Sequence, residues 1–78
     1  MNEKDMKFVS DAIAKYNAQS AAGHHTISII DFTVYPEEHE NGAKMALKFK
    51  EHRWGGDKET TLEYKNFEQL TKWFNYHT

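Results

Sequence analysis

Two alternating segments separated by a pair of glycines constrain the fold of this chain more than any other feature. Residues 44–53 and 59–64 each alternate between apolar and polar side chains, which is typical of strands with one buried face. Between them, Gly55-Gly56 is a two-residue hairpin signal. The sequence therefore predicts an antiparallel hairpin with a definite register: Phe49 opposite Leu62, Leu47 opposite Tyr64, Lys48 opposite Glu63 and His52 opposite Glu59.

A third strand is predicted over residues 26–35, which are rich in β-branched and aromatic side chains. Its alternation breaks near Ile29, so that either a bulge changes the phase or both faces are partly covered. Pro36 cannot donate to a sheet ladder and is expected near the strand end, before a loop that closes at Asn41-Gly42. The preferred register sets Val34 opposite Met45, Phe32 opposite Leu47 and Ile30 opposite Phe49, whereas a tighter Asn41-Gly42 hairpin would keep the same faces and shift the pairing.

One helix is expected before these strands in the sequence and another after them. Apolar side chains recur at spacings of three and four from roughly Lys4 to Ala22, and Gly23 is a natural helix stop. Asn66, with Gln69 three residues later, is a capping-box variant that predicts a second helix from Phe67 to about Tyr76. The predicted fold is α+β, a three-stranded antiparallel sheet in α-β-β-β-α order with both helices on one face. With 78 residues and 38% apolar content, we expect a single domain over residues 1–78.

Composition and motif spacing argue against several functional classes. The chain has no cysteine, which excludes disulfides, thiolate zinc sites and a cysteine nucleophile. No two of its five histidines show the helical spacing of a zinc site, and no serine lies in a nucleophile elbow. We therefore expect no enzyme activity, no metal and no cofactor. The absence of long apolar runs and the charged first residues predict a cytoplasmic protein that does not bind membranes.

Nucleic-acid binding is an alternative that the sequence supports less well. The α-β-β-β-α order resembles that of double-stranded RNA-binding domains. Those domains carry a lysine cluster at the start of the last helix, where this chain reads Asn66-Phe67-Glu68-Gln69. The formal net charge of −2 and the isoelectric point of about 6.2 also lack the basic footprint of a duplex binder.

The sheet face opposite the helices is the candidate binding surface. It is either an ordinary solvated face with lysine–glutamate pairs, or a recognition surface in which aromatic and aliphatic groups are ringed by charge. The acidic loop at Glu37, Glu38 and Glu40 is first explained as a solvated loop, and it is the second candidate, as a phosphate mimic against a basic partner, should the open face not bind. The open face is expected to show Tyr35, Thr33, Ile29, Ile27, Lys48, Lys50, His52 and Thr61, with Trp54 at the hairpin tip.

Short segments from Asp31 to Phe74 resemble small phage anti-CRISPR proteins that inhibit type I surveillance complexes. The segments are Asp31-Phe32-Thr33-Val34-Tyr35, Glu40-Asn41-Gly42-Ala43-Lys44, Phe67-Glu68-Gln69-Leu70 and Trp73-Phe74.

The resemblance covers about half of the chain, and the long first helix has no counterpart in it. Residues 36–39 form an insertion, and an acidic interface residue expected on the next strand falls at Lys50 or Glu51. The resemblance implies a non-enzymatic inhibitor that binds a subunit of a CRISPR effector complex and blocks recognition of the target nucleic acid, with Tyr35 as an interface tyrosine. An interaction protein with an unknown partner remains a further alternative.

Overall fold

A computed structural model describes residues 1–23, 25–37 and 39–77 of the chain. The order of elements is α-β-β-β-α, as the sequence predicts. In chain order they are α1 (Glu3–Ala21), β1 (Ile27–Val34), a 3-10 turn η1 (Glu40–Gly42), β2 (Met45–Glu51), β3 (Lys58–Tyr64) and α2 (Phe67–His77).

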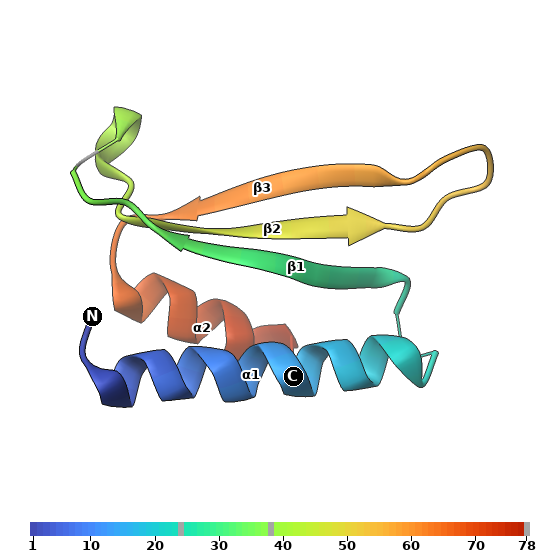
Figure 1. The fold of residues 1–78 in the computed structure, drawn as a ribbon, viewed down its shortest axis with the longest axis horizontal. Coiled ribbons are helices and arrows are strands. Elements are labelled where there is room, and N and C mark those ends of the chain that lie inside the picture. The colour runs from blue at the N-terminus through green and yellow to red at the C-terminus, as the bar shows by residue number, and fades with distance from the viewer. Residues whose placement is uncertain (24, 38, 78) are drawn as a thin grey trace.

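The three strands form an antiparallel sheet in the order β1-β2-β3, and both helices lie on one of its faces (Figure 1). This inner face and the helices enclose the core. The uncovered side of the sheet is called the outer face below. The fold class and the placement of the helices are therefore confirmed.

A bulge in β1 resolves the broken alternation of that strand. The register shifts between Ile29 and Asp31, so that Ile29 pairs with Phe49 and Asp31 pairs with Lys48. The extra residue brings Ile29 onto the same face as Phe32, toward the helices. Two predicted pairs, Val34 with Met45 and Phe32 with Leu47, are confirmed. The third pair, Ile30 with Phe49, is wrong because Ile30 is the extra residue of the bulge and Ile29 pairs with Phe49 instead. Ile27 and Ile29, which were expected on the outer face, also face the core.

The predicted register of the second hairpin is wrong by two residues. Phe49 pairs with Thr60 rather than Leu62, and Leu47 pairs with Leu62 rather than Tyr64. The strands end at Glu51 and resume at Lys58, so the connection is a six-residue loop and not a turn of two glycines. A shift of two residues leaves every side chain on its predicted face, because the pleat repeats every two residues. The predicted pairs of Lys48 with Glu63 and of His52 with Glu59 are likewise absent.

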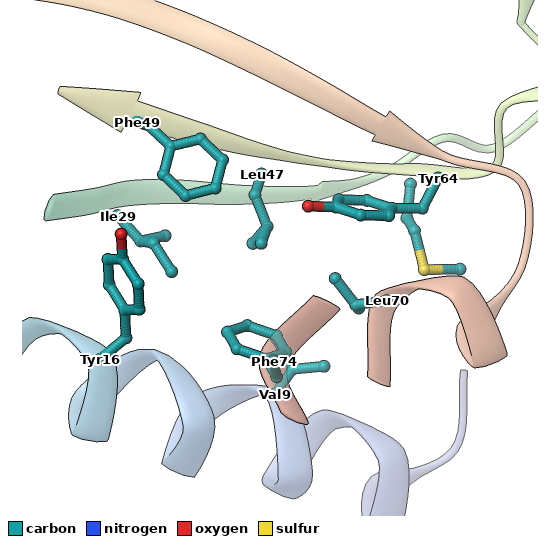
Figure 2. Close-up of a cluster of buried hydrophobic side chains, with 9 residues drawn as sticks. Val9, Tyr16, Ile29, Leu47, Phe49, Tyr64, Leu70 and Phe74 are labelled. Carbon is teal, nitrogen blue, oxygen red and sulfur yellow. The ribbon is translucent and has the colours of Figure 1, made fainter. Parts of the chain in front are cut away.

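Side chains from all five main elements make up the core (Figure 2). Leu47 and Leu70 are fully buried at its centre, between β2 and α2. The helices contact each other through aromatic rings: the centroids of Phe8 and Phe67 lie 5.8 Å apart, and those of Tyr16 and Trp73 lie 5.4 Å apart. The buried members are Val9, Tyr16, Ile29, Met45, Leu47, Phe49, Tyr64, Leu70 and Phe74.

Side-chain hydrogen bonds fix both helices. The Asn66 side chain accepts a bond from Gln69 N (2.9 Å), and the Gln69 side chain accepts one from Lys65 N, so the predicted cap of α2 is confirmed. Asn2 caps α1 by accepting from Asp5 N (2.8 Å). No helix within the described ranges has the length and apolar content needed to cross a membrane.

Candidate functional site

The outer face of the sheet is the surface that the sequence singles out, and neither α1 nor α2 covers it (Figure 1). Alternation and the β1 bulge bring Thr33, Lys48 and Thr61 to this face. The exposed Ile30 is the extra residue of the bulge beside Lys48. Ala46 lies between Thr33 and Glu63 in the two ladders and is only 4% exposed. The face is therefore a three-stranded platform that is narrow and mostly polar.

Tyr35 is held in place at one end of this platform. Its ring stacks on His39, with centroids 3.5 Å apart and planes inclined by 11°. Its hydroxyl donates a hydrogen bond to the Glu63 carboxylate across the sheet, at 3.0 Å, and its backbone N–H donates to Lys44 O at 2.9 Å. Partial desolvation, followed by the bond to Glu63, raises the pKa of Tyr35 above its usual value. The hydroxyl is therefore a neutral donor at physiological pH.

The predicted cations of the outer face are paired with carboxylates. Lys48 Nζ lies 3.5 Å from Glu59, and Lys50 Nζ lies 3.8 Å from Asp57. His52 Nδ1 also contacts Asp57, at 3.1 Å. These contacts fit the solvated face with ion pairs that the sequence left open. Since the groups are 38–65% exposed, each pair contributes little to stability.

Trp54 and the acidic loop lie at opposite ends of the molecule. Trp54 is fully exposed in the loop between β2 and β3, at the right of Figure 1. The loop that holds the exposed Glu37 and Glu40 lies at the other end, next to Tyr35 and its partner His39. Glu38 lies outside the described residues. The structure thus brings Tyr35 together with the acidic loop and separates both from Trp54.

The outer face presents side chains that can bind a partner. It offers a fixed aromatic ring, hydroxyls and paired charges. Across the described part of the chain, no group of three or more His, Asp or Glu side chains is placed to hold a metal ion.

Comparison with known proteins found no matching family model, no matching curated protein and no matching solved structure. The geometry of the chain and the resemblance of its short motifs are therefore the grounds for a functional proposal.

Two features of the surface escape sequence reasoning. His39, as the stacking partner of Tyr35, comes from the far side of a loop, and no spacing rule predicts that contact. A groove on the inner face, lined by Tyr16, Phe49 and Trp73 among others, is the second feature. A sequence feature that could have revealed the groove is that the last helix is shorter than the strands of the hairpin. The 11 residues of α2 extend about 16 Å, whereas seven-residue strands extend about 23 Å.

Proposed function

We propose that this protein is a non-enzymatic protein-binding inhibitor that uses the outer face of its sheet. Following the motif resemblance, its partner is a subunit of a CRISPR effector complex, and binding obstructs recognition of the target nucleic acid. If the chain is encoded by a phage, it acts in the host cytoplasm.

The fixed tyrosine carries the proposal. Interfaces gain most of their affinity from a few aromatic anchors, and an anchor that is already immobilised loses little entropy on binding. Tyr35 meets this requirement because it is stacked on His39 and hydrogen-bonded to Glu63. It also falls in the segment that resembles anti-CRISPR proteins.

Charge on the outer face supports a protein partner over a nucleic acid. Lys48 and Lys50 are neutralised by nearby carboxylates, so few free cations remain there to contact phosphates. Paired rim charges of this kind tune association with a protein more than they add affinity.

The test replaces the anchor and leaves the fold intact. Tyr35→Ala is expected to weaken binding to a purified effector complex by about 2 kcal/mol or more, which is the loss typical of a hot spot. Tyr76→Ala, at an 86% exposed tyrosine on α2, is the matched control and leaves binding unchanged. Lys48→Glu changes the association rate and its salt response more than the dissociation rate.

The binding assays also discriminate between partners. Affinity for the effector complex that falls steeply with salt and survives Tyr35→Ala would point to phosphate contacts and overturn the proposal. If Tyr35→Ala folds and inhibits like the parent, the acidic loop with Glu37 and Glu40 becomes the next candidate surface.

A further inference from the structure

A second binding site lies on the inner face of the sheet, beyond the end of α2. The groove there has a volume of about 310 Å³, within the range of about 300–1,000 Å³ typical of small-molecule sites. It forms because α1 lies beneath β1, while α2 is too short to reach the loop end of β2 and β3 (Figure 1). The inner face of this part of the hairpin is left uncovered.

Aromatic rings form the floor of this groove. Phe49 and Trp73 lie with ring centroids 5.2 Å apart, and Tyr16 lies 5.4 Å from Trp73. Leu62 adds an aliphatic wall and stays 40% exposed, which is high for a side chain on the core side of a sheet. These surfaces suit a flat apolar body that can stack against rings.

The hydroxyl of Tyr16 is an unused donor in this groove. Tyr16 is only 5% exposed, yet within the described ranges its hydroxyl has no hydrogen-bond partner. Figure 2 shows the side chain rising from α1 with the hydroxyl at its sheet end, near Ile29 and Phe49. Burial raises the pKa of this hydroxyl, so it stays protonated and able to donate. Because the hydroxyl opens into the groove, a ligand that brings an acceptor can replace the water that it would otherwise bind.

The mouth of the groove carries a surplus of positive charge. Glu51, Arg53 and Lys58 all line it. Glu51 is bonded to Arg53, and Lys58 forms no ion pair within the described part of the chain. An uncompensated lysine beside an apolar floor favours an anionic group on the ligand and disfavours a cationic one.

We propose that this groove binds a small aromatic acid. The ring system lies against Phe49, Trp73 and Leu62, the acidic group faces Lys58, and an acceptor atom accepts a hydrogen bond from the Tyr16 hydroxyl. This site is on the opposite side of the sheet from Tyr35 and does not depend on the function proposed above.

Two dyes of the same shape test the charge requirement. 8-Anilinonaphthalene-1-sulfonate carries one acidic group, and N-phenyl-1-naphthylamine is its neutral analogue. In a Trp54→Phe background, Trp73 is the remaining tryptophan and reports on the groove by energy transfer. The expected result is saturable binding of one sulfonate dye, tighter than that of the neutral dye, with amide shifts at Thr60 and Leu62.

Matched variants locate the site. Lys58→Glu is expected to weaken the sulfonate dye about fivefold and to spare the neutral dye, whereas Lys65→Glu, at an exposed lysine outside the groove, spares both. Leu62→Ser weakens both dyes, and Val34→Ser, at a similarly exposed residue of 42%, weakens neither.

Three results would overturn the proposal. They are equal affinity for the two dyes, equal effects of Lys58→Glu and Lys65→Glu, and amide shifts that avoid β3. Lys58 is exposed, so the lysine comparison stands even if Leu62→Ser loses its fold.

Discussion

Tyr64 illustrates what one buried polar atom does to this small core. The residue is 6% exposed, and in the described part of the chain its hydroxyl is buried without a hydrogen-bond partner. Figure 2 shows the ring lying between the sheet and Leu70. Desolvation raises the pKa of this hydroxyl to about 12. An orphaned buried hydroxyl costs stability that its ring must outweigh.

Tyr64→Phe is therefore expected to raise the free energy of unfolding at pH 7 by about 1 kcal/mol. The parent should also lose stability at high pH. Because the folded pKa lies above the unfolded value of about 10, the unfolded state loses its proton first as pH rises. The contribution of Tyr64 to the free energy of unfolding is intact below pH 10 and is lost towards pH 12, a decrease of about 2 kcal/mol. In Tyr64→Phe, this pH-dependent decrease is absent.

Urea unfolding at pH 7 and at several values from pH 9 to 12 measures both effects. Tyr76→Phe, at an 86% exposed ring, is the control and should follow the parent. A loss of stability in Tyr64→Phe at pH 7 would mean that the hydroxyl has a partner in solution.

At the scale of elements, sequence reasoning recovers faces better than registers. The alternation in residues 44–53 assigns Leu47 and Phe49 to the core, and both are buried. It cannot distinguish registers that differ by two residues, since both preserve every face. The glycine pair favoured a tight turn, but Gly55 and Gly56 lie within a longer loop in which His52 contacts Asp57. The length of the loop decides the register, and the alternation of apolar and polar residues does not encode that length.

The contact between α1 and β1 could not be predicted from the sequence either. Asn17 lies in the middle of a helix and looks like a surface residue. Its side chain donates to Ile29 O at 2.9 Å and accepts from Ile29 N at 2.8 Å, beside the bulge in the edge strand. These two bonds satisfy backbone groups that would otherwise lack partners at the open edge of β1. A pattern based on polarity does not reveal such a pairing.

Asn17→Ala is expected to destabilise the protein by about 1–3 kcal/mol, because both backbone groups of Ile29 are partly buried and lose their partners. Asn75→Ala, at an exposed site on α2, is the control for helix propensity and should stabilise slightly. Thermal melts of the two variants measure the difference. Equal melting temperatures would show that water replaces the amide of Asn17 without cost.

The whole molecule has two layers, a sheet and a pair of helices, and this arrangement separates its two candidate sites. Sequence periodicity predicted the layers and therefore the outer face with Tyr35. It did not predict the groove, which depends on where α2 ends relative to the hairpin and on how the aromatic rings of three elements meet. Non-local contacts of this kind decide which apolar residues stay partly exposed, as Leu62 does.

Independence of the two sites follows from this geometry. Tyr35 contacts His39 and Glu63 at one end of the outer face, whereas the groove lies on the inner face at the loop end of the hairpin. Changes at distant sites without shared partners add to within about 0.5 kcal/mol. Tyr35→Ala should therefore alter the affinity of the groove for 8-anilinonaphthalene-1-sulfonate by no more than about twofold.

The converse measurement completes the test. Saturating the groove with the dye should leave binding of the effector complex unchanged, while Leu62→Ser should lower only the affinity for the dye. A coupling of about tenfold in either direction would require the strands to have two arrangements, each favoured by one ligand. The sheet would then transmit binding between its faces, and the two surfaces would have to be treated as one site.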